Sequence, residues 1–211
     1  FQCFDDFLAL LTARKRKQIR KERAAVTEQG IVLKTLSGAD LDLAFWQQFY
    51  RFYCDTYQKR SRHQGYLTLD SFLCWGQSMA DQIVVFAAFA DKAMLAASLC
   101  FQSDTTLYGR YWGCADDVNF LHFECCYYSG IEYCIRQGLQ FFDAGAQGEH
   151  KLQRGFAPVL RHGFYQFTDK AQHKALNEAI ARYCLHEQKA VEQYRQEAAL
   201  SLPFANSVVE R

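Results

Sequence analysis

Three consecutive β-prone runs in the middle of the chain constrain its fold most strongly. They cover residues 82–90, 93–102 and 105–114, and only two residues separate each run from the next. Connections this short join neighbouring strands as antiparallel hairpins, because a parallel pair needs a long crossover. The sequence therefore predicts an antiparallel meander of three strands at the centre of the fold.

Helical patterns precede the meander. Apolar residues recur at three- and four-residue intervals, which is the spacing of one helical face. They predict helices over residues 5–28, 39–60 and 69–80, and Gly30 is expected to end the first of them. A brief alternation over residues 31–35 predicts a short strand between the first two helices.

The elements after the meander complete the prediction. We expect a helix over residues 121–137, a strand over 141–144, a second strand over 160–167 and a long helix over 170–200. Helices on both sides of a meander indicate an α/β (α+β) fold, with a mixed, mostly antiparallel sheet flanked by helices. The order does not follow the doubly wound Rossmann pattern, although several α+β folds fit it.

Composition limits the class of protein. Half of the 211 residues are hydrophobic and only two are proline, which indicates a globular chain. The longest apolar stretch, residues 83–90, is much shorter than the roughly 20 residues of a membrane-spanning helix. The nine cysteines contain no Cys-x-x-Cys pair and are typical of reduced thiols, so we expect a cytoplasmic protein. The first residue is Phe1, from which we expect the C-terminal portion of a longer protein.

Positive charge is concentrated in one segment. Residues Arg14 to Arg23 include seven basic side chains and one acidic one, whereas the whole chain has a net charge of only +1. Such a segment attracts phosphate groups, including those of RNA, but it is equally typical of a solvated helix face. We expect residues 1–36 to form an N-terminal basic helix with its connecting segment, and residues 37–211 to form the main domain.

The last strand of the meander carries the first candidate site. Strict alternation would place Tyr108, Arg110 and Trp112 on one face. An arginine between two aromatic rings suits a planar or anionic substrate, because the rings exclude water while the guanidinium donates paired hydrogen bonds. A structural aromatic cluster is the alternative interpretation.

The start of the following helix carries the second candidate site. His122 and Glu124 lie two residues apart, and the positive end of a helix stabilises a carboxylate but disfavours a charged imidazole. A neutral imidazole can act as a base, so His122 and Glu124 are candidate catalytic residues. The alternative is a helix-capping arrangement.

The glycine-rich loop after residue 144 carries the third candidate site. Glu149 and His150 are candidates for proton transfer, whereas Gln147, Lys151 and Arg154 are candidates for binding an anionic substrate. Ligand sites commonly lie where strands of an open sheet lead into loops.

Metal binding is a weaker hypothesis. Imidazoles and carboxylates are common ligands of zinc and iron, and the candidates would be His122, Glu124, Glu149 and His150. Their spacing matches no compact metal motif, so we expect no metal cofactor.

The same three segments resemble a known family. Tyr108–Cys114, Leu121–Tyr127 and Gly145–Pro158 are similar to a bacterial family that is grouped with FemAB-like acyltransferases and described as peptidoglycan biosynthesis or recognition proteins. The resemblance implies a fold of the GNAT (acetyltransferase) superfamily and the transfer of an acyl or aminoacyl group to an amine. FemAB enzymes proper use aminoacyl-tRNA to modify a peptidoglycan precursor.

The resemblance leaves the donor open between acyl-CoA and aminoacyl-tRNA. The basic segment Arg14–Arg23 suits a tRNA partner, and a peptidoglycan precursor is the expected acceptor. The Arg/Gln-x-x-Gly-x-Gly/Ala pattern of acetyl-CoA enzymes does not precede the helix that contains Cys125. The rival hypothesis is a non-catalytic module that recognises a cell-wall precursor or RNA.

Overall fold

A computed structural model describes residues 1–145, 149–164, 166 and 170–201. It divides into two compact units: residues 1–8 with 16–147, and residues 9–15 with 148–211. No helix in this described part is both long enough and apolar enough to cross a bilayer. The division predicted between residues 36 and 37 stays a prediction.

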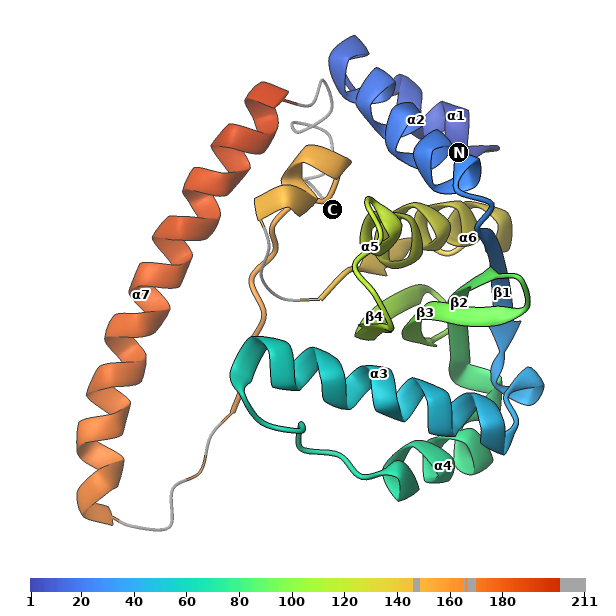
Figure 1. Ribbon diagram of the computed structural model, residues 1–211. Helices are drawn as coiled ribbons and strands as arrows, with labels where there is room; N and C mark the ends of the chain where they lie inside the picture. Colours follow the sequence, from blue (N-terminus) through green and yellow to red (C-terminus); the bar gives the residue numbers. More distant parts are fainter. Residues whose placement is uncertain (146–148, 165, 167–169, 202–211) are drawn as a thin grey trace. The chain divides into compact units, whose positions relative to one another are not determined.

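A five-stranded sheet forms the centre of the first unit (Figure 1). The strands follow chain order across the sheet; the first three pairs of neighbours are antiparallel, whereas the last pair, β4 and β5, is parallel. Their bounds are β1 Val32–Ser37, β2 Ile83–Ala90, β3 Ala93–Gln102, β4 Thr106–Cys114 and β5 Phe141–Asp143. The predicted meander is therefore confirmed as β2, β3 and β4.

Local residues explain the first hairpin. Asp91 and Lys92 both have positive φ, at 46° and 73°, which is the backbone twist that a two-residue connection requires.

β2 is buried along most of its length because helices cover both faces of the sheet. A strand buried on both faces has a continuous apolar sequence rather than an alternating one.

Helices α3 (Leu43–Ser61) and α4 (Leu69–Ser78) cover one face (Figure 1). Asp42 caps α3 by accepting a hydrogen bond from the backbone N–H of Phe45 at 2.8 Å. Aromatic side chains of both helices form the core over this face. The short 3-10 turns η1 (Gly38–Asp40) and η2 (Ala80–Gln82) lie at the ends of β1 and α4.

The other face is covered by a helix of mixed geometry and by part of the N-terminal region. The segment from Leu121 to Gln137 is one helical stretch, as predicted, but it contains a π-helical turn. Its parts are α5 (Leu121–Phe123), the π turn η3 (Glu124–Tyr128) and α6 (Ser129–Gln137).

The single helix predicted over residues 5–28 is wrong, because the chain breaks it into α1 (Phe4–Ala9) and α2 (Ala13–Glu28). Thr12 lies in the break, and its Oγ1 accepts a hydrogen bond from the backbone N–H of Lys15 at 3.4 Å. A threonine in this position caps a new helix rather than continuing the old one.

The second unit contains the 3-10 helix η4 (Glu149–Arg154) and the long helix α7 (Lys170–Ser201). The strand predicted over residues 160–167 is wrong for its described residues, 160–164 and 166, which adopt neither helix nor strand. An apolar run forms a strand only where a neighbouring edge pairs with its backbone. The fold class itself is confirmed: a mixed, mostly antiparallel sheet flanked by helices.

Candidate functional site

Strand β4 has an open edge next to β5. β5 pairs with β4 only through Thr106, Leu107 and Tyr108. From Gly109 to Cys114, β4 still pairs with β3 on its other side, but no strand of the described chain pairs with this edge. The last two strands therefore separate and leave backbone hydrogen-bonding groups of β4 available to a ligand.

A β-bulge lies at the point where the two strands separate. Cys100 of β3 pairs with Gly109 and the preceding residue Leu99 pairs with Tyr111, so Arg110 is the extra residue. A bulge reverses the side-chain alternation beyond it. Bulges are also common next to active sites.

The bulge overturns one sequence-based prediction. Tyr108 is paired with Phe101, which lies on the α3–α4 face, whereas Trp112 packs in the cluster on the opposite face. Directly paired residues share a face, so Tyr108 and Trp112 lie on opposite faces of the sheet. The predicted alignment of Tyr108, Arg110 and Trp112 on one face is therefore wrong.

His122 lies beside β4. Its ring is 5.3 Å from the ring of Trp112 and 5.4 Å from that of Tyr127, and both contacts are edge-to-face. The imidazole is partly buried within this aromatic group. The structure thus brings the first and second predicted segments together through Trp112 and His122.

Glu124 faces a different element. Arg23 of α2 donates from Nε to both oxygens of the Glu124 carboxylate, at 3.1 and 3.2 Å, and its Nη2 is 2.8 Å from Glu132 Oε2. Ser129 Oγ adds a weaker bond to Glu124 at 3.4 Å. In a π turn residues five apart in sequence lie on the same side of the helix, which is the relation of Glu124 to Ser129.

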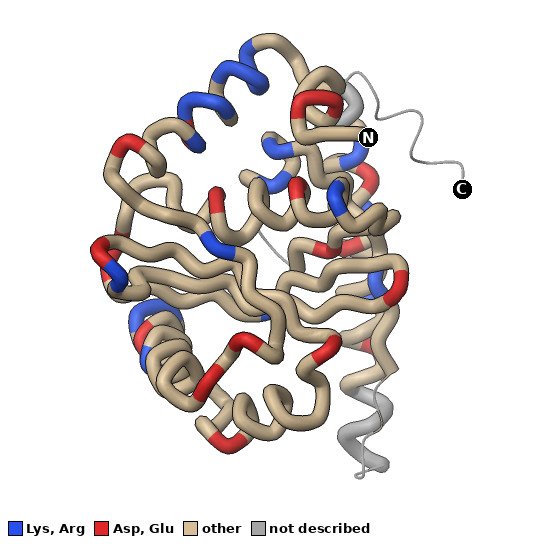
Figure 2. Tube along the Cα trace, turned by 90° about the vertical axis from the view of Figure 1, so that its right-hand side faces the viewer, with Lys and Arg blue, Asp and Glu red and all other residues tan. Residues whose placement is uncertain are grey.

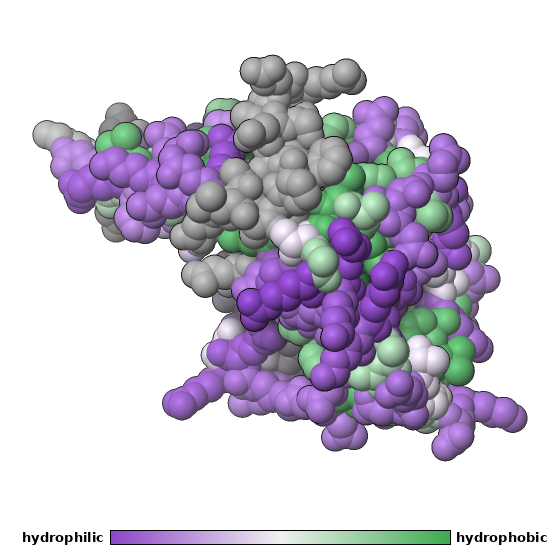
Figure 3. All heavy atoms as spheres, turned by 90° about the horizontal axis from the view of Figure 1, so that it is seen from above, coloured by the Kyte–Doolittle hydropathy of each residue, from purple (hydrophilic) through white to green (hydrophobic). Residues whose placement is uncertain are grey.

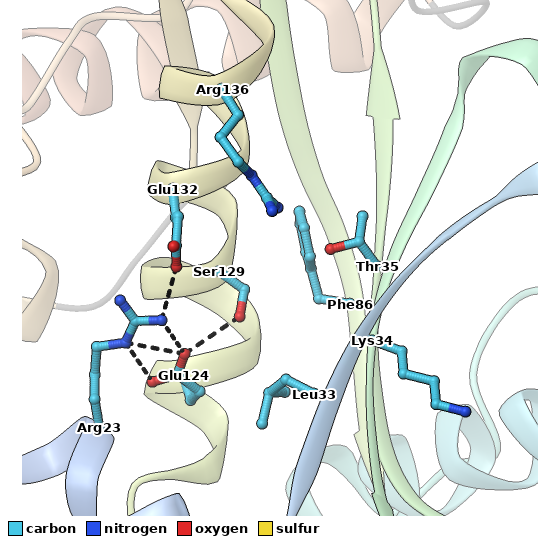
Figure 4. A pocket seen from close by; sticks show the side chains of 9 residues that line it. All are labelled: Arg23, Leu33, Lys34, Thr35, Phe86, Glu124, Ser129, Glu132 and Arg136. Carbon is cyan, nitrogen blue, oxygen red and sulfur yellow. Dashed lines mark hydrogen bonds and ion pairs between the residues drawn. The ribbon is translucent and has the colours of Figure 1, made fainter. Parts of the chain in front are cut away.

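This network lines a cleft of about 320 Å³ (Figure 4). The cleft lies between α2, β1 and the helical stretch that contains Glu124, and Arg23 points into it from α2. Burial raises the pKa of the Glu124 carboxyl, and Arg23 offsets only part of that rise. Burial lowers the pKa of Arg23, but Glu124 and Glu132 more than compensate, so the guanidinium stays charged.

Figure 2 colours the Lys and Arg positions of the basic segment blue along the Cα trace. The basic side chains of this segment are of two kinds. Arg23 and Arg20 are paired with acids, the latter with Asp5 at 2.8 Å. Lys17 and Lys21 are exposed on α2. Among the coloured atoms of the face shown in Figure 3, hydrophilic side chains lie between apolar ones. The apolar side chains on this face form no single broad surface.

The third predicted segment lies largely in the second unit. Gln147 is outside the described residues, and Glu149 begins η4. Arg154 is buried, and its Nη1 donates to the backbone oxygen of His150 at 3.0 Å. Lys151 is partly buried in the same turn. The convergence of all three segments on one site stays a prediction.

Sequence reasoning missed Arg23 as the partner of Glu124, because 101 residues separate them. A signal was nevertheless present in the basic segment. Ile19, Glu22 and Val26 recur at the spacing of one buried helical face, and all three are buried. Tyr128 donates a hydrogen bond to Glu22, so this face of α2 contacts polar as well as apolar groups.

The described residues contain no group of three acids, imidazoles or thiols placed to hold a metal ion.

Comparison with known families identifies the chain. The model of the FemAB-like family, described as peptidoglycan biosynthesis/recognition, matches residues 1–206. The chain belongs to the FemAB-like family. A comparison with curated protein sequences gives no match.

Several solved structures are similar to this FemAB-like chain. A possible acetyltransferase from Clostridium difficile 630 has 7% identity and a TM-score of 0.49, over 66% of this chain and 99% of that one. An aminoglycoside acetyltransferase from an uncultured soil metagenomic sample, in complex with sisomicin, has 12% identity and a TM-score of 0.44, over 68% of this chain and 97% of that one. An integron cassette protein from the mobile metagenome of V. cholerae has 12% identity and a TM-score of 0.45, over 69% and 97%.

Proposed function

We propose that this FemAB-like protein is an N-acyltransferase, which moves an acyl or aminoacyl group from an activated donor to an amine on a peptidoglycan precursor. The open edge of β4 carries the proposal. Beyond Tyr108 this edge has no strand partner among the described residues, and it begins at the bulge of Arg110. Backbone N–H groups at such an edge can bind a donor and stabilise an oxyanion.

The reaction needs proton transfer as well as an oxyanion site. The acceptor nitrogen attacks the donor carbonyl, the new C–N bond forms, and the bond to the leaving group breaks as the tetrahedral intermediate collapses. The nitrogen loses one proton to a base, and the leaving group takes one up. We assign the base to His122, which lies against Trp112 of β4. Glu149 and His150 are proposed for the return of the proton.

Glu124 has a positioning role in this proposal. Its carboxylate is bound by Arg23 and its side chain is only 5% exposed. The pair ties α2 to the helix that carries His122. Because Arg23 donates hydrogen bonds to both oxygens of this carboxylate, we assign Glu124 to holding the helix in place rather than to taking a proton from the substrate.

We propose aminoacyl-tRNA rather than acyl-CoA as the donor. Exposed Asp116 and Asp117 lie in the loop just before α5, where their charge repels a diphosphate. Exposed Lys17 and Lys21 on α2 instead offer positive charge to an RNA backbone. Tyr108, Arg110 and Trp112 near the edge, with Lys151, Arg154 and Gln147 of the third segment, are the proposed substrate-binding residues.

A product assay tests the reaction. The full chain is incubated with a UDP-linked muropeptide and with either aminoacyl-tRNA or an acyl-CoA, and the acylated peptide is measured by mass spectrometry. We expect product from aminoacyl-tRNA and a loss of at least roughly 100-fold in His122→Gln. His186→Gln is the matched control, because His186 is exposed on α7. Equal rates in the two variants would remove His122 from the mechanism.

One observation favours a non-catalytic binding module as the second candidate. Of the two predicted catalytic residues in the first unit, Glu124 is held by Arg23, which leaves His122 as the sole acid–base candidate there. A thermal-shift response to a donor or muropeptide, without product from any donor, would establish this module instead.

A further inference from the structure

Aromatic side chains gather at the connection between α3 and α4. Tyr66 is 83% exposed, and the ring of His63 lies 4.8 Å from it. His63 is also 5.2 Å from Tyr57, and the rings of Tyr57 and Tyr66 are 6.0 Å apart in an edge-to-face arrangement. Packing within the protein does not account for an aromatic ring that is left almost wholly in water, and exposed apolar clusters commonly mark binding sites.

The connection is held in one conformation. Tyr53 Oη accepts hydrogen bonds from the backbone N–H groups of Tyr66 and Leu67, at 2.9 and 3.2 Å. The N–H of Gly65 donates to His63 Nδ1 at 3.0 Å. Gly65 has φ of +90°, and a Cβ there would overlap the Tyr53 ring. The rings are therefore fixed before a ligand arrives, which lowers the entropic cost of binding.

A positive charge is linked to these rings through two further tyrosines. Arg110, at the bulge of β4, has its guanidinium 4.4 Å from the centre of the Tyr111 ring. Tyr111 contacts Tyr53, which in turn contacts Tyr57. Burial raises the pKa of Tyr57, and the positive charge of Arg110 acts in the opposite direction.

The guanidinium of Arg110 has N–H donors that are available to a ligand. Its side chain is exposed and forms no ion pair within the described part of the protein. One face of its guanidinium packs on Tyr111, while the N–H groups at its edge can bind a carboxylate with two parallel hydrogen bonds.

We propose that Tyr57, His63, Tyr66 and Arg110 form a binding site for a sugar ring that carries a carboxylate. Tyrosine and histidine rings pack against the C–H faces of a pyranose, and their polar atoms reach its hydroxyl groups. The guanidinium supplies the charge for the carboxylate. The site goes beyond the proposed reaction, because it binds the sugar whether or not an acyl group is transferred.

Two sugars that differ in a carboxylate test the site. N-acetylmuramic acid has one and N-acetylglucosamine lacks it, and each is titrated into the full chain while the amide NMR signals of residues 57–66 and 110 are followed. We expect both to perturb these signals, with tighter binding of N-acetylmuramic acid. Tyr66→Ala should weaken both sugars by roughly three- to tenfold. Arg110→Gln should remove the preference for the acid.

Two exposed positions provide matched controls. Arg51→Gln removes an exposed arginine of α3, and Tyr183→Ala removes an exposed tyrosine of α7. Both should bind the sugars as the unmodified chain does. The chain is also titrated with AMP, which offers a planar base and a phosphate.

Three results would overturn the proposal. They are no perturbation by either sugar, unchanged affinity in Tyr66→Ala, and binding of AMP at these residues without binding of N-acetylmuramic acid. Sugar binding by a chain that yields no product would support the site and refute only the transfer reaction.

Discussion

Arg23 and Glu124 are joined by a two-pronged ion pair across 101 residues of sequence. The Glu124 side chain is 5% exposed and that of Arg23 is 29% exposed, whereas Arg20 of the same helix and its partner Asp5 of α1 are 60% and 73% exposed. Arg23 and Arg20 of α2 therefore allow a direct comparison of a buried pair with a surface pair.

Removal of Arg23 should lower the stability of the protein more than removal of Arg20. We expect Arg23→Ala to lower the free energy of unfolding by about 2–4 kcal/mol, because the Glu124 carboxylate is left buried and unpaired. Arg20→Ala should cost less than about 1 kcal/mol, since exposed ion pairs contribute little. Urea unfolding of both variants measures the difference, and equal losses would mean that the Arg23 pair adds nothing beyond a surface contact.

The loss in Arg23→Ala should depend on pH. Burial already raises the pKa of Glu124 in the folded protein, and without Arg23 nothing in the pair offsets that rise. A carboxyl with a raised folded-state pKa costs no stability below its unfolded pKa, near 4.3, and costs progressively more as the pH rises through the folded value.

Unfolding is therefore measured at pH 4.5 and 7.5. The deficit of Arg23→Ala relative to the unmodified chain should be smaller at the lower pH. The double variant Arg23→Ala/Glu124→Gln should show no such dependence, because it has no carboxyl at this position. A deficit that is the same at both pH values would show that Glu124 is not the group responsible.

Two glycines of β4 should respond differently to alanine. A Cβ at Gly113 would lie 2.5–2.7 Å from atoms of Phe52, two of them backbone, where α3 crosses the sheet. A Cβ at Gly109 would meet its nearest neighbour, the backbone oxygen of Asp143, at 3.5 Å, which is an ordinary contact. We expect Gly113→Ala to cost about 1–3 kcal/mol and Gly109→Ala less than about 1 kcal/mol. Thermal unfolding that ranks them in the reverse order would refute this packing.

The cysteines should differ in reactivity. Burial raises the pKa of Cys134 to about 12 and raises those of Cys100 and Cys125 as well, so these thiols stay protonated at pH 8. Only the thiolate is alkylated. We expect iodoacetamide to label the exposed Cys3, Cys74 and Cys184 in the native protein. Mass spectrometry that finds native Cys100 labelled at a similar rate would contradict this assignment.

Local patterns predicted most of the sheet but not its details. The three runs of the meander have nearly the bounds that the sequence indicates, because two-residue connections leave few alternatives for the pairing. The bulge at Arg110 could not be found in this way, since it depends on the register against β3. It reversed the faces of Tyr108 and Trp112, on which the first candidate site was based.

The sequence also could not predict which distant groups the charged side chains of α2 pair with. Periodicity places Glu22 on a buried face of α2 but cannot say which distant group meets it or its neighbour Arg23. Arg23 belongs to a basic segment that suits a nucleic acid by charge alone, and the fold pairs it with Glu124 instead. Long-range pairing of this kind is set by tertiary packing rather than by sequence spacing.

Amide hydrogen exchange tests the central claim most directly, which is that the open edge of β4 binds the activated donor. Exchange of residues 109–114 is measured with and without aminoacyl-tRNA, and uncharged tRNA serves as the control. We predict that the charged donor slows exchange in this segment more than uncharged tRNA does. Protection confined to α2, with residues 109–114 unchanged by either RNA, would contradict the claim.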